Sequence, residues 1–191
     1  FIKSVFNKKA QAVEMIATFF DRKFGAENFY TTNPAWNEYE ETQNSLIGFT
    51  TTFESEKLKI KPRVYWKRNQ DMFLLKRNEP NFFRNLHITD KMGAEVNASY
   101  SSELGVTGFG VDISKIYIRS NNLGHRNRFM TNVFLEHQFK LFNNRLDITP
   151  GVAVTYFSDF KFHAFPGLDI GYRLNDHFKI YGNTGYTYRI P

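Results

Sequence analysis

The chain has 191 residues, a net charge of +6 at pH 7 and no cysteine, which excludes a disulfide framework and a thiolate metal site. Aromatic residues make up 17 % of the sequence, yet hydrophobic residues reach only 41 % and the mean hydropathy is −0.47. No run approaches the roughly 18 apolar residues that a transmembrane helix needs. The basic residues are scattered rather than gathered into one run, which argues against nucleic acid as a partner.

Alternation of apolar and polar residues with a period of two predicts about ten β-strands. The first long segment, Lys8–Phe24, also has the Ala, Glu and Met content of an amphipathic helix, but the rhythm of the later segments favours a strand. The clearest later strands are Leu58–Lys67, Met92–Tyr100, Thr107–Arg119, Ile148–Tyr156, Phe162–Leu174 and Phe178–Tyr188. These segments run for about 9–13 residues, which matches the roughly 9–11 residues of a tilted strand that crosses a membrane.

Each predicted strand has one apolar and one polar face. In Leu58–Lys67, for example, Ile60 and Val64 alternate with Lys61 and Arg63. Over the whole chain the polar set consists of small, amide and charged residues, including many glycines that permit close approach of another object. Such a face fits the lumen of a barrel, whether a plug domain or water fills that lumen.

The predicted connectors alternate in length along the chain. The short ones are Asn7–Lys9, Ser55–Lys57, Ser102–Gly105, Asn143–Arg145 and Asn175–His177. Those between them are Asp21–Gln43, Gln70–Asp90, Ser120–Arg128 and Ser158–Lys161, and most of these are longer. Up-and-down transmembrane barrels sort their connectors in this way. The sequence therefore predicts an all-β fold, an antiparallel transmembrane β-barrel segment of about ten strands with short periplasmic turns and long extracellular loops.

The long connectors contain rings, amides and imidazoles, which together suit a large amphipathic ligand that needs flat apolar contact and directional hydrogen bonds. Packing of one loop against another is the alternative role for each of these residues. The candidate ligand-binding residues are Tyr30, Trp36, Tyr39, Phe82, Phe83, Asn85, His87, Asn122 and His125.

The sequence offers no catalytic or cofactor motif. It contains no Walker loop, dinucleotide fingerprint or G-x-S-x-G elbow, and Gly108-Phe109-Gly110 is a strand segment rather than a phosphate loop. The histidines show no paired metal spacing; they are His87, His125, His137, His163 and His177. We expect no catalytic residue, no metal site and no cofactor.

Several segments of the chain resemble the barrel of TonB-dependent receptors of the Bacteroidetes type, and most closely the cobalamin-receptor branch. They are Lys23-Phe24-Gly25-Ala26, Phe29-Tyr30, Tyr39-Glu40-Glu41-Thr42, Val64-Tyr65-Trp66-Lys67-Arg68 with Asp71 and Leu75, Asn85 with His87 and Thr89, Gly93 with Glu95, Asn122-Leu123-Gly124-His125-Arg126, Phe165-Pro166-Gly167-Leu168 and Tyr188-Arg189-Ile190-Pro191. The resemblance covers nearly the whole chain and is weakest in residues 1–20.

The resemblance implies that residues 1–191 are part of a 22-stranded barrel domain whose plug domain lies outside this sequence. It implies an outer-membrane location in a Gram-negative bacterium and active import of cobalamin or a related corrinoid, energised through TonB. Lipopolysaccharide and other outer-membrane lipids, and a surface lipoprotein, are the further partners that it suggests. The alternatives are a receptor for a siderophore or an oligosaccharide, a passive porin, and an outer-membrane hydrolase.

Overall fold

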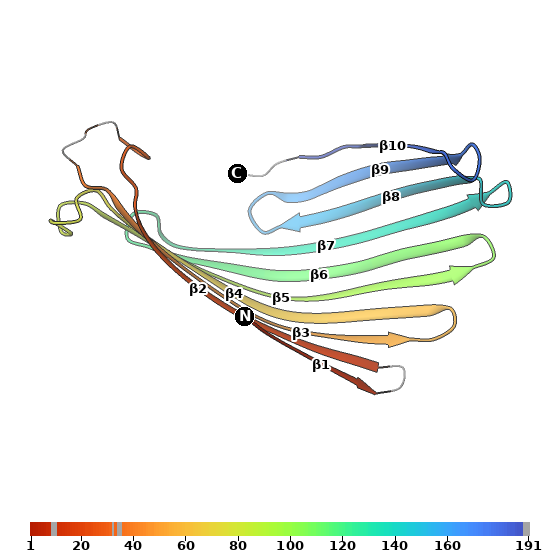
Figure 1. Cartoon of the computed structure of the whole chain (residues 1–191), viewed down its shortest axis with the longest axis horizontal. Helices are drawn as coiled ribbons and strands as arrows, with labels where there is room; N and C mark the ends of the chain where they lie inside the picture. The colour runs from red at the N-terminus through yellow and green to blue at the C-terminus, as the bar shows by residue number, and fades with distance from the viewer. Residues whose placement is uncertain (9–10, 32, 34–35, 189–191) are drawn as a thin grey trace.

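The chain forms one antiparallel sheet in which each strand pairs with the next in sequence (Figure 1). The computed structural model describes residues 1–8, 11–31, 33 and 36–188, so Lys9 of the first predicted turn and the final Arg189-Ile190-Pro191 lie outside the described residues. The strands are β1 (Ile2–Lys8), β2 (Gln11–Gly25), β3 (Tyr39–Glu54), β4 (Leu58–Leu74), β5 (Arg84–Ser102), β6 (Gly105–Ser120), β7 (Gly124–Leu141), β8 (Leu146–Phe157), β9 (Lys161–Arg173) and β10 (Lys179–Gly185). For the segment predicted as a strand rather than a helix, Lys8–Phe24, the prediction is confirmed over Gln11–Phe24, whereas Lys8 ends β1 and residues 9–10 lie outside the described residues.

In the described part of the chain, the strands form a single curved layer, and no second layer of helices or strands packs on either face (Figure 1). Its accessible surface is 13642 Å², whereas a soluble protein of this mass exposes about 9,500 Å². A soluble domain of this length buries one face of its sheet against a second layer. Within the described part of the chain, no helix is long and apolar enough to cross a membrane.

The two faces of the sheet differ in chemistry as the alternation predicts. On one face large apolar side chains stand exposed across neighbouring strands, among them Phe49, Val64, Val96, Val111, Val133 and Val154. On the other face a polar row crosses the sheet in register through Thr50, Arg63, Glu95, Asp112, Asn132 and Thr155. We call these the apolar face and the polar face. Exposed apolar surface on this scale marks a surface that contacts lipid or protein.

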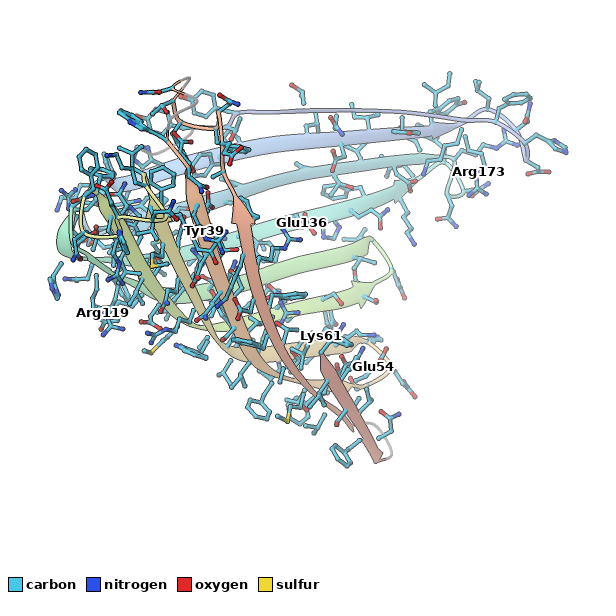
Figure 2. All side chains as sticks on the ribbon, turned by 60° about the vertical axis from the view of Figure 1, so that its left-hand side comes forward. Tyr39, Glu54, Lys61, Arg119, Glu136 and Arg173 are labelled. Atoms are coloured by element: carbon cyan, nitrogen blue, oxygen red, sulfur yellow. The ribbon has the colours of Figure 1, made fainter. Side chains whose placement is uncertain are left out.

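The two ends of the sheet also differ (Figure 1). At the turn end the connectors are residues 55–57, 103–104, 142–145 and 174–178. At the loop end they are residues 26–38, 75–83, 121–123 and 158–160. The first two loop-end connectors are long, as expected, whereas the last two are as short as the turns. In Figure 2, Tyr39 and Arg119 lie toward the loop end, and Glu54, Lys61 and Arg173 toward the turn end.

The strands extend further toward the loop end than the sequence pattern predicts. The predicted connector Gln70–Asp90 shrinks to residues 75–83, because β4 runs on to Leu74 and β5 begins at Arg84. The predicted connectors Asp21–Gln43 and Ser120–Arg128 shrink in the same way. Polar residues occupy both faces of the strands near the loop end. The alternation of apolar and polar residues therefore disappears there, although the backbone pairing of the strands continues.

Candidate functional site

A pocket of about 410 Å³ opens on the polar face at the loop end. Three segments of the chain line it: the 26–38 connector, the end of β4 with the start of its connector, and the start of β5 with the residue before it. Its lining residues are Tyr30, Thr31, Asp71, Phe73, Leu75, Phe83, Asn85 and His87. Four of the residues predicted from sequence, Tyr30, Phe83, Asn85 and His87, therefore meet in one pocket.

A buried carboxylate fixes the 26–38 connector over the sheet. Glu38 is only 1 % exposed, and it accepts hydrogen bonds from the Thr31 hydroxyl at 2.5 Å and from the backbone N–H of Tyr30 at 3.4 Å. The backbone N–H of Ala26 donates to the Glu38 carbonyl at 2.9 Å, which closes the base of the connector. The Tyr30 ring then packs edge-on against Phe73, with ring centroids 4.7 Å apart. The aromatic wall of the pocket is thus held in place by hydrogen bonds.

The hydrogen bonds around His87 determine which ring nitrogen carries the proton. The Ser120 hydroxyl lies 2.9 Å from Nδ1 of His87 and also accepts backbone N–H groups from Asn122 at 3.1 Å and Leu123 at 2.9 Å. Those two bonds use both lone pairs of the hydroxyl oxygen, so its proton is donated to Nδ1. The neutral imidazole of His87 therefore carries its proton on Nε2 and offers that N–H as a donor.

Carboxylates lie beside this donor. Asp71 stands directly opposite His87 in the register of β4 and β5, which brings their Cβ atoms to about 5 Å. Glu40 lies at the loop end of β3, beyond the apolar part of the strand, and burial raises the pKa of its carboxyl, with the charge of Asp71 adding to the effect. Burial, with the charges of Glu40 and Asp71, raises the pKa of Tyr30 and keeps its phenol protonated.

The remaining predicted residues lie outside this pocket. Tyr39 is on the apolar face, where its hydroxyl donates to Glu41 at 2.8 Å and the Arg77 guanidinium covers its ring. His125, opposite Arg119, is also on the apolar face.

The other three belong to the loop-end connectors. Phe82 lies under the Lys76 ammonium, 4.0 Å from its ring centroid. Trp36 donates its backbone N–H to the Asn33 carbonyl at 3.1 Å. The side-chain NH₂ group of Asn122 donates a hydrogen bond to the side-chain oxygen of Asn85, so Asn122 helps to position a residue that lines the pocket.

Sequence reasoning missed the floor of the pocket. Asp71 and Phe73 are on β4, whereas the sequence pattern predicts that this strand ends at Lys67 and places both residues in a connector. The polar face of β4 holds Arg63, Tyr65 and Lys67, and continuing that alternation reaches Asp71 and Phe73. This extension was the signal available in the sequence.

A second hollow, of about 580 Å³, lies nearer the middle of the polar face. Arg63, Tyr65, Lys67, Lys91 and Glu95 are among its lining residues, with Arg63 and Glu95 paired at 3.6 Å. In the part of the chain that the structure describes, no group of three or more His, Asp or Glu side chains is placed to hold a metal ion. The polar face therefore offers hydrogen bonds, charge and aromatic contact.

Comparisons with known proteins place this geometry in a family. The family model described as "TonB dependent receptor-like, beta-barrel" matches residues 9–191. No curated protein matches the sequence. The siderophore receptor PirA from Pseudomonas aeruginosa is similar in structure, with a TM-score of 0.81 and 12 % identity over 99 % of this chain and 32 % of that one.

Two further solved structures are similar to the chain. The unliganded ferric citrate transporter FecA has a TM-score of 0.72 and 13 % identity over 96 % of this chain and 34 % of that one. A variant of the ferric enterobactin receptor PfeA from Pseudomonas aeruginosa has a TM-score of 0.71 and 12 % identity over 88 % of this chain and 29 % of that one. The chain thus spans about a third of the length of these receptors, and at this identity they show the fold alone.

The family match covers nearly the whole chain, and the structure supplies the ten antiparallel strands that a barrel segment requires. The predicted fold class and the predicted outer-membrane location are therefore confirmed, and the family is one of transporters rather than enzymes. In the barrel, the apolar face of the sheet contacts lipid, the polar face lines the lumen, and the loop end is extracellular. The chain belongs to the TonB-dependent receptors and forms part of their β-barrel in the outer membrane of Gram-negative bacteria.

Proposed function

We propose that the chain is the part of an active outer-membrane transporter that captures a corrinoid, with cobalamin as the ligand, at the loop-end pocket. The plug domain and the segment that contacts TonB belong to parts of the protein outside residues 1–191. Binding at the extracellular pocket precedes a rearrangement of the plug that is driven through TonB. The pairing of a donor and an acceptor across β4 and β5 carries this proposal.

A primary amide fits that pair of groups. His87 offers Nε2–H as a donor and Asp71, directly opposite, offers a carboxylate as an acceptor. An amide carbonyl accepts from the first and its NH₂ group donates to the second. A corrin ring carries side-chain amides around its edge, so it presents this group repeatedly. The rings of Tyr30 and Phe83 then contact the apolar part of the ligand.

The charge of the pocket favours such a ligand over an anionic ferric siderophore. The described side chains that line the pocket include one carboxylate and no lysine or arginine, and Glu40 lies close enough to Asp71 for the charge of Asp71 to raise the pKa of the Glu40 carboxyl. A polyanionic ligand would meet unfavourable electrostatics here. A neutral, amide-rich ligand does not. The volume of about 410 Å³ accommodates the edge of a corrinoid, and other barrel strands and the plug contact the rest.

The test is titration of the full-length receptor with cobalamin. His87→Phe keeps a ring but removes the donor, and we expect affinity to fall about two- to tenfold, as for one lost hydrogen bond. His177→Phe, at the turn end, is the matched control and should bind normally. An unchanged unfolding midpoint of the His87→Phe variant would show that the loss of affinity arises from the pocket and not from a defect in folding.

A second titration tests the acceptor. A cobalamin derivative with one peripheral amide hydrolysed to a carboxylate should bind the wild type more weakly, and Asp71→Asn should recover part of that loss because it removes the facing negative charge. If the receptor binds a ferric siderophore but not cobalamin, or if Asp71→Asn leaves the discrimination unchanged, the corrinoid proposal is wrong.

A further inference from the structure

Two lysines stand directly opposite each other on the polar face. Lys67 on β4 pairs in register with Lys91 on β5, so their Cβ atoms are about 5 Å apart. Lys67 is exposed and Lys91 is half-buried. Like charges in this arrangement repel each other and destabilise a sheet, and an anion placed between the two ammonium groups relieves the repulsion. We call Lys67 and Lys91 the lysine pair.

The hollow of about 580 Å³ in the polar face contains the lysine pair and has an excess of positive charge. Its charged lining residues are Lys3, Glu14, Arg63, Lys67, Lys91 and Glu95. The Glu14 carboxylate lies 3.5 Å from the Lys3 ammonium, and the Glu95 carboxylate lies 3.6 Å from the Arg63 guanidinium. Among the residues that the structure describes, no carboxylate forms an ion pair with the lysine pair. The excess charge of the hollow is therefore located on these two lysines.

Aromatic and aliphatic side chains surround the lysine pair. The Tyr65 ring lies over Gly93, where a Cβ would overlap the ring atoms, and the Lys91 ammonium is 5.7 Å from the centroid of that ring. Leu46 on β3 and Ile116 on β6 are the next residues of the same register row on either side of the pair. Because these apolar neighbours displace water, they strengthen an electrostatic contact made beside them.

The lysine pair lies below the loop-end pocket on the same two strands. Lys67 is four residues from Asp71 along β4, and Lys91 is four residues from His87 along β5. An even spacing keeps all of these side chains on the polar face, and four residues of strand span about 13 Å. A large ligand held between Asp71 and His87 can therefore reach the lysine pair with another part of its structure.

We propose that the lysine pair binds one phosphate group and that the transported ligand supplies it. Each ammonium group has three N–H donors, and their charge-assisted hydrogen bonds to phosphate oxygens are strong. This inference rests on the proposed function, because cobalamin carries one phosphodiester in its nucleotide loop in addition to the amides at the ring edge. The ligand is then recognised at two places, through an amide in the loop-end pocket and through the phosphate about 13 Å deeper in the lumen.

The experiment compares two corrinoids that share the ring amides but differ in the phosphate. Cobinamide lacks the nucleotide loop, so it can contact the loop-end pocket but brings no phosphate to the lysine pair. Titration of the wild-type full-length receptor should show about tenfold tighter binding of cobalamin than of cobinamide. Lys67→Gln with Lys91→Gln should remove this preference and leave the affinity for cobinamide unchanged.

Two further variants and a competitor separate the site from a general effect of charge in the lumen. Lys67→Arg with Lys91→Arg keeps both positive charges and should keep the preference for cobalamin. Lys57→Gln with Lys61→Gln removes two positive charges toward the turn end, where Figure 2 labels Lys61, and should also keep it. Inorganic phosphate should weaken the binding of cobalamin to the wild type and leave the binding of cobinamide unchanged.

Three outcomes would overturn the inference. They are an unchanged preference for cobalamin in the double glutamine variant, an equal loss of affinity for both corrinoids in that variant, and loss of the preference in the turn-end control. An unchanged preference together with a lower unfolding midpoint would show that a carboxylate elsewhere in the receptor occupies the site instead.

The same titrations distinguish this inference from the proposed function. If the lysine variants have no effect but His87→Phe weakens the binding of both corrinoids, the proposed function stands and only the phosphate site is wrong. If the wild type binds neither corrinoid, both are wrong.

Discussion

Two glycines with unusual backbone angles allow the same substitution to be tested in two environments. Gly105, at the start of β6, has φ +136, and a Cβ placed there would overlap the backbone carbonyl oxygen of Gln138 on β7. Gly124, at the start of β7, has φ +71, and a Cβ there would meet nothing within 4 Å. Alanine at either position is strained by its backbone angle, but only at Gly105 must the neighbouring strand also move.

The expected losses follow from that difference. Gly124→Ala should cost about 1–2 kcal/mol, the penalty for a side chain in the left-handed region. Gly105→Ala carries a similar penalty and also forces apart the end of the β6–β7 ladder, which holds Gly105 opposite Phe139. Two lost backbone hydrogen bonds add about 1–3 kcal/mol. We therefore expect Gly105→Ala to destabilise the receptor by about 2–5 kcal/mol.

Urea unfolding of the full-length receptor in detergent measures both losses. Gly124→Asn should recover most of the stability, because asparagine tolerates φ near +60°, whereas Gly105→Asn should not. Equal losses for the two alanine variants, or rescue at Gly105 by asparagine, would refute the reasoning from the carbonyl overlap.

Three further outcomes are expected. Glu38→Ala removes the acceptor for Thr31 and the Tyr30 N–H, so residues 26–38 should be cleaved faster by a protease while the strands stay intact; an unchanged cleavage rate would show that the connector is held otherwise. Because the pKa of Glu40 is raised in the folded protein, its charged form destabilises the fold, and stability is lost as pH rises through that pKa. The Glu40→Gln variant should therefore be more stable than the wild type at neutral pH and lose this advantage at acidic pH. Urea unfolding midpoints of both proteins at the two pH values measure the difference. Single cysteines at Val96 and Asn97, carrying spin labels in the receptor in lipid, should be accessible to oxygen and to a water-soluble nickel reagent respectively; the same accessibility at both would contradict the assignment of the two faces.

Much of the fold could be predicted from the sequence because membrane contact imposes a strict pattern. Between Met92 and Tyr100 every second residue contacts lipid, so the alternation defines both the strand and its faces. Beyond Asp90 the strand leaves the apolar layer and meets water on both faces. The local alternation of residues then carries no information about strand pairing, which is why the sequence pattern predicts a connector where β5 begins at Arg84.

Only part of the candidate pocket could be predicted, and for a different reason. Residue type alone was enough to select Tyr30 and His87, since rings and imidazoles suit a large ligand. It did not reveal that His125 lies on the opposite face, because that depends on the parity of β7, which begins at Gly124 rather than after Arg128. Nor did it reveal Asp71, whose partner His87 is set by the β4–β5 register.

The most direct measurement of the central claim is a structure of the full-length receptor with cobalamin bound. We predict that one peripheral amide of the corrin lies between β4 and β5, with its carbonyl accepting from Nε2 of His87 and its NH₂ group donating to Asp71, and that Tyr30 contacts the ring edge. Cobalamin bound only to the plug or to other strands, with these three side chains free, would contradict it.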